Sequence, residues 1–184
     1  MSDQRQLITW LLKDKYHQST EKLDFDQLAP ELLHDLKRLQ QGEPLAYVIG
    51  WVDFLGCRID LSKKTLIPRP ETEYWVEQAI RKVLNFPNYA PQKSLRVLDL
   101  CCGSGCIGIA ILKHLPNVTT DFVDTDPNAV TQTEQNLQLN HCDQNRTHVF
   151  CAHLFESCSG EYDFIFSNPP YVSDSGEVGD ETKY

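Results

Sequence analysis

The segment from Asp163 to Tyr171 carries the side chains whose types and spacing most clearly suggest chemistry. Its apolar run at 164–166 predicts a short buried strand, because aromatic and β-branched residues favour strands. The two prolines that follow end this strand, since proline cannot donate to a sheet ladder. Asn168, Pro169, Pro170 and Tyr171 are therefore expected at the carboxyl end of a strand, where open α/β sheets bind ligands.

These four residues suit an amino group that is attached to a flat conjugated system. The side-chain oxygen of Asn168 and the carbonyl oxygen of Pro169 can accept both hydrogens of one –NH₂ group. The ring of Tyr171 can stack on the conjugated plane. Holding both N–H bonds toward acceptors aims the nitrogen lone pair at an electrophile, which is catalysis by positioning. The alternative is a proline-rich turn after a core strand, without a chemical role.

A glycine-rich turn upstream indicates a cofactor site. The turn Cys101, Cys102, Gly103, Ser104 and Gly105 follows a predicted strand and precedes a helix. Its two glycines allow a tight turn and close approach of a ligand. Asp124 ends the next strand and is placed to accept hydrogen bonds from ribose hydroxyls. The alternative is that Asp124 or Asp126 caps a helix, and Asp126 is the better N-cap. Neither a third dinucleotide-type glycine nor a P-loop lysine follows.

Alternating strands and helices position these residues. The patterns predict strands at 95–100, 118–124, 147–152 and 162–167, with helices at 107–115 and 128–139. Such alternation implies right-handed crossovers and a parallel sheet with helices on both faces. Upstream, the spacing predicts a helix at 4–17, a second that starts after Asp26 and ends at Gly42, and a third with an inner face from Trp75 to Leu84. The residues between Gly42 and Leu61 predict a β-hairpin, with Tyr47 to Ile49 as strand.

Composition narrows the function classes. The 184 residues carry a net charge of −9, with a pI near 5.0, which argues against binding nucleic acid through bulk charge. No apolar run is long enough to span a membrane. The first residues lack a secretion-signal pattern, so the expected location is cytoplasmic. Seven scattered cysteines without paired spacing predict reduced thiols, with neither a disulfide framework nor a metal site.

Four blocks of the sequence resemble one family in order. They are Gly42 to Tyr47, Leu66 to Glu73, Leu98 to Ile107, and Asn168 to Tyr171. With these blocks the chain resembles the HemK/PrmC-like protein N5-glutamine methyltransferases, the release factor glutamine methyltransferases. The last block is shared with adenine-N6 methyltransferases of DNA and RNA, whereas the block at 66–73 is more specific to the glutamine enzymes.

The resemblance implies a Rossmann-like class I S-adenosylmethionine-dependent methyltransferase sheet. It implies N5-methylation of the glutamine in the Gly-Gly-Gln loop of peptide chain release factors, which act in translation termination. The release factor would be the partner, with no direct nucleic acid, membrane or metal. By resemblance, Cys101 to Gly105 would line the methionine part of the cofactor. Asp124 would hold the ribose, and Leu154 would lie near the adenine. Asn168, Pro169, Pro170 and Tyr171 would hold the substrate amide, with Asn168 also beside the cofactor.

The resemblance also implies a division of the chain. Residues 1–43 would be an N-terminal helical substrate-recognition segment, 44–65 a β-hairpin linker, and 66–184 a partial methyltransferase domain. The family fold continues with further strands, so the sheet is expected to be incomplete at its C-terminal end. The strand that precedes Asn168 would then be an open edge. Arg69 and Glu73 would lie near the cofactor or form an ion pair that fixes their loop.

The chain departs from the family pattern at two positions, and two other functions are possible alternatives. Cys102 stands where the family has a smaller residue, and His153 stands where an acidic residue precedes the adenine contact. A shortened relative could bind the cofactor or a partner without turnover. An adenine-N6 methyltransferase of DNA or RNA would instead need a basic face and a base-flipping pocket. The acidic charge and the block at 66–73 count against it.

Overall fold

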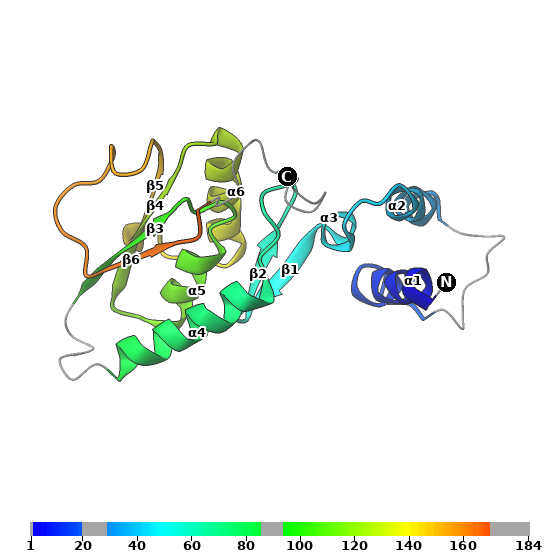
Figure 1. Ribbon diagram of the computed structural model, residues 1–184, viewed down its shortest axis with the longest axis horizontal. Coiled ribbons are helices and arrows are strands. Elements are labelled where there is room, and N and C mark those ends of the chain that lie inside the picture. Colours follow the sequence, from blue (N-terminus) through cyan, green and yellow to red (C-terminus); the bar gives the residue numbers. More distant parts are fainter. Residues whose placement is uncertain (1, 20–28, 86–93, 170–184) are drawn as a thin grey trace. The chain divides into compact units, whose positions relative to one another are not determined.

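The computed structural model describes residues 2–19, 29–85 and 94–169. The chain divides into two compact units, Met1–Trp51 and Val52–Tyr184. Figure 1 labels their α-helices and strands. The first unit holds α1 (Ser2–Asp14), α2 (Pro30–Gln40) and α3 (Leu45–Ile49). Its hydrophobic core is a cluster of leucine and valine side chains, with the buried members Leu11, Leu12, Leu32 and Val48. The recognition role predicted for residues 1–43 and the linker role predicted for 44–65 stay predictions.

A buried carboxylate joins the three helices of the first unit. Asp35 accepts hydrogen bonds from Lys15 Nζ (2.6 Å), Tyr16 Oη (2.8 Å) and Arg38 NH1 (3.2 Å). Lys15 also donates to the carbonyl of Val48 in α3 (2.7 Å). Burial opposes ionisation of Asp35, but the three donors outweigh it and lower the pKa of the carboxyl. The network therefore holds a charged group that the sequence pattern did not single out.

The expectation of strand at Tyr47 to Ile49 is wrong, because residues 45–49 form α3. Pro44 precedes the helix and its carbonyl accepts from the amides of Tyr47 and Val48. Gly50, at φ +96°, ends it. Burying Val48 in the helical cluster overrides the β preference of these side chains. The predicted cap Asp26 lies outside the described residues, and α2 begins after Ala29.

The second unit begins with a hairpin and continues as alternating helices and strands. The hairpin pairs β1 (Trp51–Phe54) with β2 (Cys57–Asp60), and both residues of its turn have positive φ, as a tight hairpin requires. The remaining elements are α4 (Pro70–Leu84), β3 (Leu95–Leu100), α5 (Cys106–His114), β4 (Val118–Asp124), α6 (Pro127–Leu139), η3 (Gln144–Arg146), β5 (Thr147–Cys151) and β6 (Phe164–Ser167). Within the described ranges, every helix is too short or too polar to cross a membrane.

Four parallel strands form the sheet in the order β5-β4-β3-β6. From β3 the chain moves outward to β4 and β5, and then returns to the other side of β3. Because crossovers are right-handed, this reversal places the β5–β6 connection on the face opposite α5 and α6. Figure 1 shows α4, α5 and α6 along one side of the sheet and the orange connection along the other. The prediction of helices on both faces is therefore wrong for the described residues, since this connection contains no helix.

Strand β6 is less buried than its apolar sequence predicts. Phe166 is buried and stacks on Trp75 of α4, with ring centroids 6.2 Å apart. Ile165, on the opposite face, is 53% exposed. The reason is position: within the described residues β6 pairs with β3 alone and forms one edge of the sheet. Among the described residues, β6 is therefore an edge strand, as expected.

Helix α5 packs so closely on β4 at Gly108 that a side chain at this position would not fit. A Cβ atom on Gly108 would lie 2.3 Å from Cε1 of Phe122 and 3.0 Å from Oδ2 of Asp99. Helix propensity alone would favour alanine by about 1 kcal/mol, but overpacking costs about 1–3 kcal/mol or more. Gly108→Ala should therefore lower the free energy of unfolding, measured by urea denaturation. Adding Phe122→Leu should restore part of the loss, and a strictly additive double variant would contradict the contact.

Candidate functional site

The glycine turn after β3 has the backbone that close ligand approach requires. Cys101, Gly103 and Gly105 all have positive φ, at +58°, +56° and +75°. A Cβ on Gly105 would lie 2.9 Å from the methyl group of Thr133, so helix α6 packs directly against the turn. A Cβ on Gly103 would meet no atom within 4 Å. Gly105 is thus required by packing, whereas Gly103 faces open space.

Asp124 ties this turn to the end of β4. Its Oδ2 accepts from the amide of Gly103 (2.9 Å) and its Oδ1 accepts from the amide of Asp126 (3.0 Å). Asp126 is the N-cap of α6, because its side chain accepts from the amide of Asn128 (2.9 Å). Each oxygen of Asp124 keeps a lone pair for a further donor. Asp126, and not Asp124, therefore caps the helix. Asp124 lies at the strand end beside the turn.

Two side chains of α6 hold the carbonyl groups of the turn. Thr133 Oγ1 donates to the carbonyl of Gly103 (3.1 Å), and Asn136 Nδ2 donates to that of Ser104 (2.9 Å). Both side chains are fully buried. Thr133 Oγ1 also lies 3.4 Å from Sγ of Cys102, so the larger residue at 102 fits against a polar neighbour. Neither residue was predicted from the sequence, where two polar side chains on the inner face of a helix were the only signal.

The amide side chains of α6 also pair with the backbone of the hairpin. Asn136 accepts from the amide of Asp60 (2.7 Å) and donates to its carbonyl (3.1 Å). Asn140 does the same at Arg58, with distances of 3.1 Å and 2.7 Å. Gln132 accepts from the amide of Lys63 (2.7 Å). This amide ladder, Gln132, Asn136 and Asn140, therefore joins the hairpin to the same helix that holds the glycine turn.

Asp99, the residue before the last of β3, is a buried acid that was also not predicted from the sequence. Its Oδ2 accepts from the amide of Gly108 (2.8 Å), and its Oδ1 has no hydrogen-bond partner among the described residues. Burial, with a smaller repulsion from the Asp124 carboxylate, raises the pKa of Asp99 to about 8, against the effect of the Gly108 bond. A polar residue inside the apolar run Val97–Leu100 was the available signal.

The other predicted residues end neighbouring strands at the same edge of the sheet. The amide of Ala152, just after β5, donates to the carbonyl of Asp124 (2.9 Å). Leu154 follows two residues later, at φ +48° and 42% exposed. Ser167 of β6 is in register with Leu100 of β3, so residues after both strands emerge side by side. The sheet thus brings together Cys101 to Gly105, Asp124, Leu154, Asn168 and Pro169.

Asn168 is half-buried and Pro169 is exposed. Within residues 2–19, 29–85 and 94–169, no hydrogen bond engages the amide of Asn168, so its oxygen and nitrogen can serve a ligand. Pro170 and Tyr171 lie outside the described residues, so the predicted aromatic contact stays a prediction. Glu73, expected near the cofactor or in an ion pair with Arg69, accepts from the amide of Leu55 in the hairpin turn (2.8 Å). That bond gives Glu73 a structural role.

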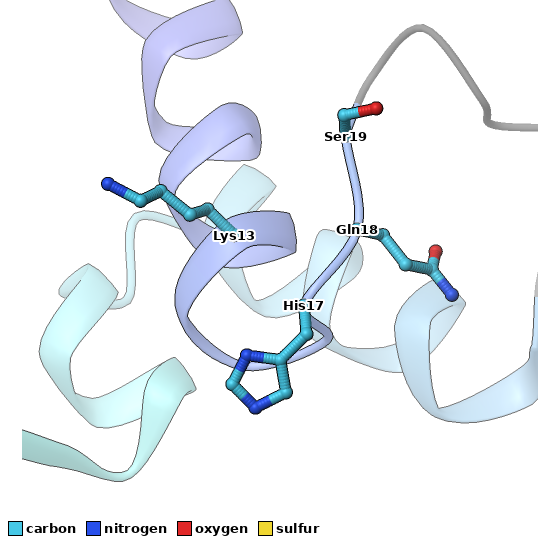
Figure 2. Close-up of a pocket in the computed structure, with 4 residues that line it drawn as sticks. All are labelled: Lys13, His17, Gln18 and Ser19. Atoms are coloured by element: carbon cyan, nitrogen blue, oxygen red, sulfur yellow. The ribbon is translucent and has the colours of Figure 1, made fainter.

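A hollow in the first unit offers no comparable chemistry. Figure 2 shows its lining at the end of α1, where Lys13, His17, Gln18 and Ser19 point in different directions. None of the predicted site residues belongs to it. The strand ends of the second unit are therefore the stronger candidate site.

The topology and the glycine turn define a class of protein. Strand order reverses at β3, and ligands of open α/β sheets bind at such a switch point. This is the fold of class I S-adenosylmethionine-dependent methyltransferases. A solved structure of the delta-N METTL16 MTase domain shares it, with a TM-score of 0.50 and 18% identity over 95% of this chain and 62% of that one.

The chain belongs to the methyltransferase small domain family, whose model matches residues 83–182. Two relatives are release factor glutamine methyltransferases. The one from Flavobacterium psychrophilum is 36% identical over 74% of this chain and 47% of that protein. The one from Aquifex aeolicus is 34% identical over 82% of this chain and 51% of that protein. They confirm the resemblance. The chain spans about half the length of the curated relatives it matches.

The buried acid makes stability depend on pH. Folded Asp99 keeps its proton up to about pH 8, whereas an unfolded aspartate loses it near pH 4. Between these values the folded state binds more protons, so the free energy of unfolding should fall as pH rises, by at most about 1.4 kcal/mol per pH unit. Asp99→Asn, which keeps an acceptor for Gly108, should remove this contribution in urea denaturation at pH 5 to 8. Equal slopes for wild type and variant would contradict a retained proton.

Proposed function

We propose that this protein methylates the side-chain nitrogen N5 of a glutamine in a protein substrate, with S-adenosylmethionine as methyl donor. The substrate is the Gly-Gly-Gln loop of a peptide chain release factor. The methylation takes place in the cytoplasm and supports translation termination. One observation carries the proposal: Asn168 and Pro169 follow the strand that pairs with β3, beside the turn held by Asp124. The two similar release factor glutamine methyltransferases support the substrate.

The residues at the strand ends fit this cofactor. Gly103 leaves open space where a side chain would stand, and Asp124 retains acceptor capacity for hydroxyl groups. Cys101 to Gly105 would hold the methionine part, Asp124 the ribose, and Leu154 the adenine. When bound, S-adenosylmethionine supplies a methyl group on a positively charged sulfur, which makes that carbon electrophilic.

The chain's own residues would then activate a poor nucleophile. An amide nitrogen shares its lone pair with the adjacent carbonyl and reacts weakly. Asn168 Oδ1 and the Pro169 carbonyl would accept its two N–H bonds, favour a pyramidal nitrogen, and fix the direction of the lone pair. With the cofactor bound, the nitrogen–carbon bond would form as the sulfur–carbon bond broke, and the surplus amide proton would pass to water. Positioning and preorganised acceptors supply the rate, and Pro170 and Tyr171 would complete the substrate contacts.

Calorimetry and a transfer assay test the proposal together. The 184-residue chain is titrated with S-adenosylmethionine, and methyl transfer from labelled cofactor is then measured on a purified release factor. A release factor whose Gly-Gly-Gln glutamine is replaced by alanine is the control and should accept no label. Binding without transfer would identify a cofactor-binding module instead. Transfer to DNA or RNA, but not to protein, would identify an adenine methyltransferase.

Removing the amide of Asn168 should stop the reaction and spare the cofactor. Asn168→Ala deletes the acceptor that orients the substrate nitrogen, and misplacement of that kind costs about 100-fold or more in rate. Single-turnover kinetics should show this loss, while calorimetry shows an S-adenosylmethionine Kd within about threefold of wild type. Equal loss of binding and rate would contradict the separate roles.

Removing Asp124 should have the opposite signature. Asp124→Ala deletes the acceptor for the Gly103 amide and the proposed ribose contact, and hydrogen bonds to charged groups contribute about 1.5–3 kcal/mol. The Kd for S-adenosylmethionine should rise by about 10-fold to 100-fold. Asp126→Ala, in the same loop, is the matched control. It removes only the helix cap, so affinity should stay unchanged, and an unchanged Kd for Asp124→Ala would remove that residue from the site.

A further inference from the structure

Hydrophobic packing specifies the register of β6 only weakly. The strand has four residues, of which Phe166 is buried and Ile165 is 53% exposed. In a sheet, a shift by one residue moves each side chain to the opposite face, and strands with little burial are prone to such slips. A shift by two residues would displace Asn168 by about 6.6 Å along the strand. Accurate placement of Asn168 therefore needs another source of register.

Hydrogen bonds fix the amino end of β6. The amide of Asp163 donates to the carbonyl of Arg96 (2.8 Å), and the amide of Arg96 donates to Oδ2 of Asp163 (2.9 Å). The guanidinium of Arg96 also donates to the carbonyl of Ser159 (2.8 Å) and lies over the ring of Tyr162, 4.6 Å from its centroid. Asp163 is thus joined to β3 by two reciprocal bonds immediately before the strand.

The same end is tied to β4. Asp121 accepts from Arg96 NH2 (2.8 Å) and from Tyr162 Oη (2.7 Å). Burial, with the hydrogen bond to Asp121, raises the pKa of the Tyr162 hydroxyl above its usual value, so the hydroxyl stays a donor. The connection that leads into β6 is therefore held against two strands before it enters the sheet.

A serine hydroxyl fixes the carboxyl end of β6. Ser167 Oγ donates to the carbonyl of Leu100 (2.9 Å), its register partner. Leu100 is the last residue before the glycine turn, and Ser167 is the last residue before Asn168. The hydroxyl therefore connects the two strand ends at the point where cofactor turn and substrate residue diverge.

We propose that Ser167 and Asp163 are positioning residues for Asn168, because their bonds to β3 set the register and end of β6. The inference deepens the proposed function and rests on it. Ser167 contacts neither the reacting nitrogen nor the methyl donor. It acts through Asn168, so its removal leaves cofactor binding intact and lowers the rate of methyl transfer.

Substitutions at 167 test the proposal by separating rate from binding. Ser167→Ala removes the donor and should lower kcat about 10-fold or more, with the Kd for S-adenosylmethionine within about twofold of wild type. Ser167→Thr keeps the hydroxyl on a residue that suits a strand, and should restore kcat to within about threefold of wild type. Wild-type kcat in Ser167→Ala, or no rescue by threonine, overturns the proposal.

Thr119 offers a matched control. Its Oγ1 donates to the carbonyl of Leu95 (3.4 Å), which is the same type of bond at the opposite end of β3. Thr119→Val should leave kcat unchanged, because Leu95 lies far along the strand from the site. A loss equal to that of Ser167→Ala would show a general effect on the sheet and overturn a specific role for Ser167.

A second measurement separates this inference from the proposed function. If the wild-type chain transfers no methyl group to the release factor, the proposed function fails and register is read by nuclear magnetic resonance. Cross-strand contacts between backbone protons of Leu98 and Ile165 are expected in the wild type. The double variant Asp163→Ala/Ser167→Ala should lose them. Their retention in the double variant overturns the proposal, whatever the activity.

Discussion

The reversal of strand order at β3 is the constraint on which the rest of the second unit depends. Right-handed crossovers carry the chain from β3 to β5 across one face, and the return to β6 must use the other face. Strand β3 is consequently paired on both sides and almost wholly buried. Its carboxyl end is flanked by the ends of β4 and β6, so the glycine turn, Asp124 and Asn168 meet. In the sequence, Asp124 lies 21 positions after Gly103, and Asn168 lies 44 positions after Asp124.

Polar side chains, more than apolar ones, then fix the details of the site. Burial of apolar side chains only requires that α5 and α6 cover the sheet. Many conformations of the glycine turn would be compatible with that burial. Thr133 and Asn136 remove this freedom by binding two successive carbonyl groups of the turn. Because both are fully buried, each missing bond would leave an unsatisfied group at a cost of about 1–3 kcal/mol. Buried polar groups thereby select one arrangement of the loop.

Local pattern predicted the elements well where burial and propensity agree. The predicted strand at 118–124 has the observed bounds of β4, because β-favouring valine, threonine and phenylalanine residues lie between a turn and an N-cap. The helix at 45–49 was missed, because packing around Val48 overrides the preference of its neighbours. The candidate residues up to Pro169 follow the carboxyl ends of the strands, as expected, and their roles in a site stay predictions. Asp99, Thr133 and Asn136 were not found, since their partners are distant in sequence and only the folded chain reveals them.

The amide ladder on α6 has a consequence for self-association. An outer strand of a small hairpin presents free backbone groups, which can recruit a strand from another molecule. Asn136 and Asn140 bind the amide and carbonyl of Asp60 and Arg58, as a neighbouring strand would. A helix thus imitates a strand with its side chains, and β2 is protected from intermolecular pairing. Asn136, which also donates to the Ser104 carbonyl of the glycine turn, thereby helps to reduce the tendency of the hairpin to aggregate.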